Sequence, residues 1–365
     1  MRTAIVSDLH LGTTSDADVA SRPAVRERLL DALADADRVV LLGDVLELRE
    51  RRVGEALELA RPFLAALGEA TAGKQVTIVP GNHDYELIAG ALDHARLDGR
   101  PSLPVAATFD TSHGDLSRRV ADLMPRTEVT LGYPGVWLRE DVYATHGHYL
   151  DLHLSVPRVE CVLASAIARF AASIDHGARP TPDFYEAALS PIYAFGYSLV
   201  QGAEGRAVTR GGNLTRAVWD RSGRRSPSGL ALGLAIPTAV TVLNSLGLGP
   251  FRGDVSALEL RRAGLRAMAA VVAALGIDAE HVVFGHTHRS GPLPGEAEGW
   301  WLPGDTQLTN TGSWLFEEVF VRGSGPSNPY WPGRIAWLED QEPPRLAGVL
   351  DDLDVANLLR TRRTP

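Results

Sequence analysis

The stretch VTIVPGNHD at residues 76–84 decides the fold, because a short apolar strand ends there in a polar turn. Its first residues are mostly β-branched and predict a buried strand, which a Pro-Gly pair then ends. Asn82, His83 and Asp84 follow at once. An amide, an imidazole and a carboxylate on one turn pack poorly in a core, and ligands bind at this edge of open α/β sheets. The stretch therefore predicts both a sheet strand and a functional site.

The chain before this stretch repeats the order of strand, polar loop and helix. The expected strands are residues 3–7 and 38–42, and the expected helices are residues 23–33 and 53–70. Strands joined in this way pair in parallel through right-handed crossovers, so their polar loops face the same edge of the sheet. Asp8 and His10 follow the first strand, and Asp44 follows the second. We therefore expect all three to lie near Asn82.

Two later strands also end in histidines. Residues 142–145 precede His146 and His148, and residues 282–284 precede His286 and His288. A further strand is expected over 308–311. Residues 341–365 predict an amphipathic helix, with apolar side chains spaced along one side.

Five strand ends thus present carboxylates, an amide and imidazoles. One such turn is commonly a helix cap, but five together are hard to explain as caps. Imidazoles that converge beside carboxylates favour a bound metal, and these donors outnumber the ligands of one zinc ion. They suit two divalent ions, such as Mn, Fe, Zn or Co, that share a bridging carboxylate. Two such ions beside two aspartates leave a local positive charge that attracts phosphate.

In this order the five blocks resemble the calcineurin-like metallophosphoesterase superfamily over about residues 1–155 and 275–320. The resemblance implies an α/β fold with two facing mixed β-sheets flanked by helices. It also implies hydrolysis of a phosphate ester or pyrophosphate bond by in-line attack of a hydroxide that bridges two metal ions. Glu47 stands where the family often has aspartate, which resembles the UDP-2,3-diacylglucosamine hydrolase branch. That branch usually has arginine at the position of His83, so its substrate is not carried over.

The resemblance also implies roles for single residues. One ion is expected on Asp8, His10, Asp44 and His288, and the other on Asp44, Asn82, His146 and His286. His83 is expected beside the leaving group as an acid or a charge stabiliser, with Asp84 orienting its ring. His148, Arg49 and Arg289 are candidates for contact with the substrate, the arginines as phosphate ligands.

The chain is expected to have four parts. These are a first part of the core at 1–150, a helical insertion or cap at 151–274, a second part of the core at 275–340, and a C-terminal helix or tail at 341–365. Within the insertion, six arginines between residues 206 and 225 precede an uncharged run at 226–251. Glycines and prolines make this run a poor spanning helix. Buried or lid helices are one interpretation, and peripheral membrane or lipid contact through 206–251 is the other.

The composition narrows the possible partners. The 365 residues carry a net charge of −9, which disfavours nucleic acid, and no basic stripe is interleaved with aromatic residues. A single cysteine, Cys161, excludes an internal disulfide. Without a signal-peptide core at the start, a cytoplasmic location is expected, with attachment to the membrane surface as a variant.

We expect a lipid-linked or nucleotide-linked phosphate as substrate. A protein or small-molecule phosphomonoesterase with a lid is the alternative. A metal-stabilised scaffold without turnover is the candidate from another class. The sequence leaves the physiological metals and the oligomeric state open.

Overall fold

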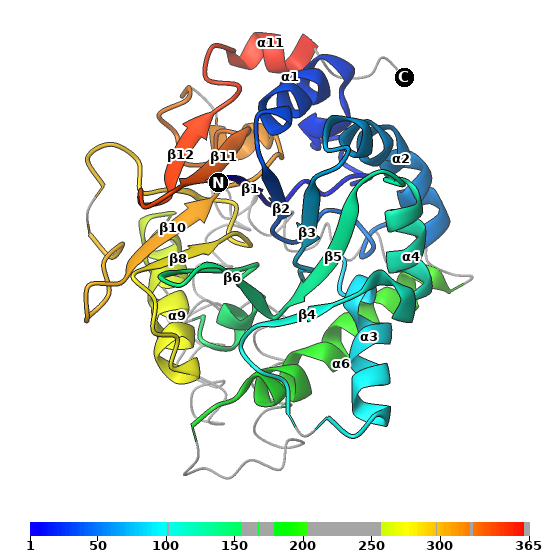
Figure 1. Ribbon diagram of the computed structural model, residues 1–365. Helices are drawn as coiled ribbons and strands as arrows, with labels where there is room; N and C mark the ends of the chain where they lie inside the picture. Colours follow the sequence, from blue (N-terminus) through cyan, green and yellow to red (C-terminus); the bar gives the residue numbers. More distant parts are fainter. Residues whose placement is uncertain are drawn as a thin grey trace, which may run out of the picture. The chain divides into compact units, whose positions relative to one another are not determined.

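The computed structural model describes residues 1–100, 102–154, 167, 179–202, 257–296, 298–321 and 324–360. Two compact units are present (Figure 1). The first comprises Met1–His148 and Ile277–Pro365, and the second is Tyr149–Gly276. The unit boundaries thus fall at 148/149 and 276/277, against the expected 150/151 and 274/275.

The first unit contains a seven-stranded sheet in the order β12-β11-β1-β2-β3-β5-β4. Its strands are β1 (Arg2–Val6), β2 (Arg38–Leu41), β3 (Gln75–Ile78), β4 (Ala107–Phe109), β5 (Glu128–Tyr133), β11 (Arg334–Glu339) and β12 (Arg345–Gly348). The central strands β1, β2, β3 and β5 pair in parallel and lie side by side in Figure 1. The predicted parallel arrangement of the first three strands is therefore confirmed, and their carboxyl ends meet at one edge.

A second, five-stranded sheet has the order β6-β7-β8-β10-β9. Its strands are β6 (Gly135–Arg139), β7 (Val142–Thr145), β8 (His281–Phe284), β9 (Ser290–Gly291) and β10 (Gln307–Thr311). β8 pairs in parallel with both β7 and β10, so these three strands also end at a common edge. β7 precedes the second unit in the chain and β8 follows it.

The inner faces of the two sheets form one hydrophobic core. Ile5, Val40 and Val79 of the first sheet cluster with Ala144 and Val283 of the second, and all five are buried. Burial of such side chains contributes about 1.5–3 kcal/mol each for the larger ones. The expected fold class, two facing mixed sheets with helices outside them, is confirmed.

Helices follow the strands of the first unit. They are α1 (Pro23–Ala34), α2 (Val53–Ala70), α3 (Glu86–Leu97), α4 (Asp115–Asp122), α10 (Glu318–Val321) and α11 (Val355–Arg360), with 3-10 turns η1 (Val19–Ser21) and η2 (Thr111–His113). The 3-10 turn η3 (His148–Leu152) begins at the last residue before the second unit. The two predicted helices correspond to α1 and α2. α2 buries Phe63, Leu64 and Leu67 on one face, the spacing that predicts it.

The predicted helix at 341–365 is wrong over its first part. Arg345–Gly348 forms β12, which pairs antiparallel with β11, and within the described residues 341–360 helix is found only over Val355–Arg360. The apolar spacing from Leu346 to Leu358 imitates a helix. However, the outer edge of β11 offers unpaired backbone groups, and a strand satisfies them where a helix cannot.

The described part of the second unit is mainly helical. It contains α6 (Pro182–Gln201) and α9 (Ala257–Leu275). Tyr149 stacks on Tyr185 at 4.6 Å and donates a hydrogen bond to buried Glu186 at 2.7 Å, which joins α6 to the start of this unit. The segment 206–251 lies outside the described residues. None of the described helices combines the length and apolarity needed to cross a membrane.

Candidate metal centre

The backbone turns sharply at most of the predicted ligands. Five of them adopt positive φ angles: Asp8 (54°), His10 (44°), Asp44 (52°), His286 (64°) and His288 (57°). This left-handed region is uncommon for residues other than glycine, and such conformations cost on the order of 1–3 kcal/mol each. They cluster where strands end and redirect the chain, so the strain is concentrated at this one edge.

Glycines beside the ligands permit close approach of the loops. A Cβ atom on Gly43 would lie 2.2 Å from Nδ1 of His146, and one on Gly81 would lie 2.2 Å from Oδ1 of Asp44. A Cβ on Gly285 would lie 2.5 Å from Oδ2 of Asp8. Distances this short are impossible for a real side chain. Glycine at these three positions is therefore a steric requirement of the site.

Asp8, His10 and His288 bring their donor atoms together. The Nε2 atoms of His10 and His288 are 3.1 Å apart, and Oδ1 of Asp8 lies 3.3 Å from Nε2 of His288. Nδ1 of His10 lies 3.0 Å from Glu47 Oε2, which leaves Nε2 to face the other two donors. Ligand atoms about 2.0–2.2 Å from one ion lie about 3 Å or slightly more apart, and this is the spacing observed.

Asp44 lies between this cluster and a second one. Its Oδ2 is 3.7 Å from Nε2 of His10 and 3.2 Å from Nε2 of His146. The ring of His146 lies edge-on to that of His286, with 5.2 Å between centroids. Nδ1 of His146 lies 2.9 Å from the carbonyl oxygen of Leu42, which fixes the ring and directs Nε2 towards Asp44. One carboxylate thus borders two groups of donors.

The side-chain chemistry of these residues fits two divalent metal ions. Oδ1 of Asp8, Oδ1 of Asn82 and Nε2 of His146 are buried and make no hydrogen bond with any described residue. A buried polar atom without a partner costs about 1–3 kcal/mol, so such atoms are rare unless a ligand satisfies them. Here the three atoms belong to three predicted ligands, and carboxylate with imidazole suits Zn, Mn, Fe or Co.

Neighbouring charges shift the pKa values of the buried residues in this site. Burial by itself would lower the pKa of His10. The bond to Glu47 and the negative charges of Asp44 and Asp8 have the larger, opposite effect and raise this pKa to about 10. Burial likewise opposes the charge of His146, yet Asp44 raises its pKa to about 9. Burial raises the pKa of Asp44, but His146 and its neighbours lower it well below its usual value.

Glu47 contacts His83 as well as His10, a role that the sequence did not predict. Nδ1 of His83 lies 2.8 Å from both carboxylate oxygens of Glu47, which is 2% exposed. The rings of His83 and His10 meet edge-on at 4.7 Å. The signal that could have revealed this role is the position of Glu47, three residues after Asp44, which the sequence offered only as a departure from the family pattern.

Asp84 does not orient the ring of His83, contrary to the sequence-based expectation. Its carboxylate accepts hydrogen bonds from the backbone amides of Gly81 at 2.7 Å and Val45 at 2.7 Å, with Asp44 and Leu46 at 3.3 Å. A short side chain cannot reach both these amides and the ring. Asp84 instead ties the loop after β2 to the loop after β3.

The three predicted substrate residues differ in their surroundings. His148 is 1% exposed, and its Nε2 lies 3.0 Å from the hydroxyl of Tyr133. Arg289 donates to Glu296 at 2.8 Å and lies over the ring of Trp300, so its guanidinium has structural partners that compete with a phosphate. The backbone N–H of Arg49 donates to Oε1 of Glu47 at 3.1 Å, which places this residue beside the carboxylate that contacts His10 and His83.

A further group of possible metal donors lies at the opposite ends of the strands. Asp141, Glu280 and His281 approach one another where β7 and β8 begin. Arg139, however, binds both oxygens of Asp141, at 2.5 and 2.8 Å. This carboxylate is already neutralised, and the group is a poor competitor for cations.

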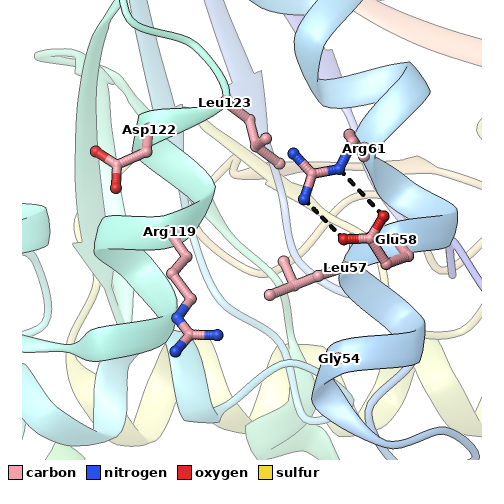
Figure 2. A pocket seen from close by; sticks show the side chains of 7 residues that line it. All are labelled: Gly54, Leu57, Glu58, Arg61, Arg119, Asp122 and Leu123. Atoms are coloured by element: carbon pink, nitrogen blue, oxygen red, sulfur yellow. Dashed lines mark hydrogen bonds and ion pairs between the residues drawn. The ribbon is translucent and has the colours of Figure 1, made fainter.

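A surface pocket between α2 and α4 contains none of the predicted site residues (Figure 2). Glu58 and Arg61 of α2 form an ion pair on one wall, and Arg119 and Asp122 of α4 line the other. Since the donors described above lie elsewhere, this pocket is not the candidate centre.

Residues 1–168 match the sequence model of the calcineurin-like phosphoesterase family. No curated protein sequence matches the chain. A cold-active protein-tyrosine phosphatase of the psychrophile Shewanella sp. is 14% identical, covering 93% of this chain and 75% of its own, with a TM-score of 0.29. A dimetal phosphatase from Danio rerio is 11% identical, covering 95% and 98%, with a TM-score of 0.33. Both structural likenesses are too weak to support a conclusion.

Gly81→Ala should disrupt the centre while leaving the fold intact. The added methyl group would collide with Asp44 Oδ1 and with Nε2 of His146, 2.7 Å away. We expect metal affinity to fall at least tenfold, as measured by titration calorimetry. Gly54→Ala is the control, because a Cβ at Gly54 meets nothing within 4 Å and alanine favours its helix. Equal affinity in both variants would contradict the steric argument.

Proposed function

We propose, on the premise that residues 1–168 match the calcineurin-like phosphoesterase family, that this site would hold two divalent ions for phosphate-ester hydrolysis, with Asp44 as a ligand of both. The chain is a metal-dependent phosphoric ester hydrolase. The proposal concerns which residues carry the reaction and which phosphates it accepts. Of the two ions, one would be held by Asp8, His10, Asp44 and His288, and the other by Asp44, Asn82, His146 and His286.

One observation supports this assignment above all. Oδ2 of Asp44 lies 3.7 Å from Nε2 of His10 and 3.2 Å from Nε2 of His146, and these two histidines belong to different donor groups. A carboxylate that serves one ion alone would face one group. Divalent ions held by these residues would supply Lewis acidity for the activation of water and would offset charge on the phosphoryl oxygens.

His83 is suited to act on the leaving group. Its side chain is 25% exposed, whereas that of Glu47 beside it is 2% exposed. Because Nδ1 is bonded to the Glu47 carboxylate, the ring is held with Nε2 as the atom available to a substrate. From there it can donate a hydrogen bond or a proton to the oxygen that departs.

The Glu47 carboxylate gives two histidines a common support. It fixes the ring of His10, a proposed ligand, and that of His83, a proposed catalytic group, with buried bonds of 3.0 and 2.8 Å. Carboxylates that bond to the far nitrogen of a ligand histidine set its orientation and basicity. Glu47 therefore couples the position of His83 to the first group of donors.

The substrate we favour is a phosphate linked to a lipid or a nucleotide. On α6, Phe195 is 64% exposed and Leu199, one turn later, is 38% exposed. No charged residue occurs from 187 to 202, so this face could accept an apolar group or a membrane surface. The alternative is a protein or small-molecule phosphomonoesterase with a lid. Peripheral attachment through 206–251 remains part of the proposal, as does a cytoplasmic location.

His83→Ala should separate hydrolysis from metal binding. We expect the variant to keep two Mn²⁺ per chain and to lose about 10²–10⁴-fold in kcat, the usual contribution of a general acid. Chromogenic phosphomonoester and phosphodiester assays, with metal analysis of the same samples, would measure both. Full turnover in the metal-replete variant would remove His83 from the mechanism. Two bound ions without activity on any ester in the wild type would favour a scaffold.

Glu47→Gln should reduce activity about 10–100-fold, because both histidines lose a charged support. Glu50→Gln is a matched control nearby: Glu50 accepts bonds from Thr13 and Thr14 and has no histidine partner among the described residues. Steady-state kinetics at saturating metal would compare them. The same loss in both variants would mean that loop order, rather than histidine support, explains the effect.

Replacing Phe195 and Leu199 by serine should weaken attachment to vesicles if the substrate is lipid-linked. Cosedimentation with phosphatidylcholine vesicles containing anionic phosphatidylglycerol would measure it, with Val200→Ala as a control at a buried position on the same helix. Negligible sedimentation of the wild-type chain would rule out the lipid surface and leave a soluble phosphate as substrate.

A further inference from the structure

The end of β10 has buried polar side chains that are not proposed ligands. Asn310 and Thr311 are each 1% exposed, and they point to opposite faces of their strand. Burial of an amide and a hydroxyl in a sheet is costly unless every polar atom has a partner. Their partners turn out to be the loops that carry the proposed ligands.

Asn310 holds the loop of His286 and His288. Its Nδ2 donates to the carbonyl oxygen of Gly285 at 2.8 Å and to Oγ1 of Thr287 at 3.0 Å. Its Oδ1 accepts from the amide of Gly312 at 2.8 Å. The amide therefore uses both donors and its acceptor. Because its donors engage the residues on either side of His286, this side chain fixes the turn in which both histidines have positive φ angles.

Thr311 acts on a different ligand through Ser7. Ser7 Oγ donates a short hydrogen bond to Oδ2 of Asp8 and lies 2.5 Å from Oγ1 of Thr311. A serine hydroxyl has one proton, so once it is given to Asp8 the threonine must be the donor to serine. The direction of the chain of bonds is thus Thr311 to Ser7 to Asp8, and a chain of hydroxyls polarises each of its members.

This arrangement determines which oxygen of Asp8 faces the donors of the other ligands. Oδ2 accepts from Ser7 and from the amide of His286 at 3.1 Å. Oδ1 has no hydrogen bond in the described part of the chain, and it lies near His288. Ser7 follows β1 in the first sheet and Thr311 ends β10 in the second, so the bonds also join the two sheets beside the centre.

We propose that Ser7, Asn310 and Thr311 are positioning residues that set the donor atoms of the metal centre before an ion binds. The inference rests on the proposed function. It assigns different roles to these residues: Ser7 and Thr311 orient the carboxylate of Asp8, which is a proposed ligand of one ion. Asn310 serves His286 and His288, which belong to different ions.

The separate tasks predict different patterns of metal loss. Ser7→Ala and Thr311→Val should weaken one of two Mn²⁺ sites about 10–100-fold and leave the other near its original affinity. Asn310→Ala should weaken both. Thr311→Ser keeps the donor and should restore the wild-type pattern. Thr309→Val is the control, since Thr309 is buried on the same strand and makes no side-chain hydrogen bond to another described residue.

The experiment is calorimetric titration of the full chain with Mn²⁺ after treatment with chelator, and thermal unfolding of each variant without metal. A general loss of stability would weaken binding in Thr309→Val as well and would not be rescued by Thr311→Ser. Two sites of wild-type affinity in folded Ser7→Ala and Thr311→Val would overturn the proposal. If Asn310→Ala does not fold, these two variants still decide the outcome. A wild-type chain that binds fewer than two ions would instead contradict the proposed function.

Discussion

A single buried carboxylate connects the parts of this site. Oδ1 of Asp44 accepts the backbone amide of His83 at 2.9 Å, while Oδ2 faces His10 on one side and His146 on the other. These residues follow β1, β2, β3 and β7, so strands of both sheets must end at the same level for the contacts to form. The two sheets pack over a shared core, and this packing brings the ends of strands that are distant in the sequence to the same place.

Close approach of the loops imposes the second constraint. Three glycines leave no room for a Cβ, and five of the proposed ligands adopt backbone conformations that other residues avoid. Neither feature favours stability taken alone. Both are tolerated because side chains outside the turns stabilise them: Asp84 accepts hydrogen bonds from loop backbone amides, and Asn310 donates one to a loop carbonyl oxygen. The site is therefore built in layers: donor atoms inside, then the carboxylates and hydroxyls that aim them, then the sheets.

The two differences between expectation and structure have the same physical origin. Asp84 follows His83 directly, which suggested that it orients the ring, yet the nearer backbone amides take its carboxylate and Glu47, from another strand, reaches the ring. Residues 345–348 have helical spacing of apolar side chains, yet the edge of β11 draws them into a strand. In both cases unpaired backbone groups decide the outcome: the amides of Gly81 and Val45 take the carboxylate of Asp84, and the free edge of β11 takes residues 345–348.

The sequence by itself determined the strand-and-loop rhythm, the parallel pairing of the first three strands and the set of residues that could hold metal, because apolar periodicity and residue chemistry are local properties. Only the tertiary structure decided which atom of each residue faces which partner. The roles of Glu47, Ser7 and Asn310 depend on contacts between segments 23 or more residues apart. Asn310 lies 23 positions from Thr287, Glu47 lies 36 from His83, and Ser7 lies 304 from Thr311. Such contacts follow from the packing of whole sheets, and no local pattern encodes them.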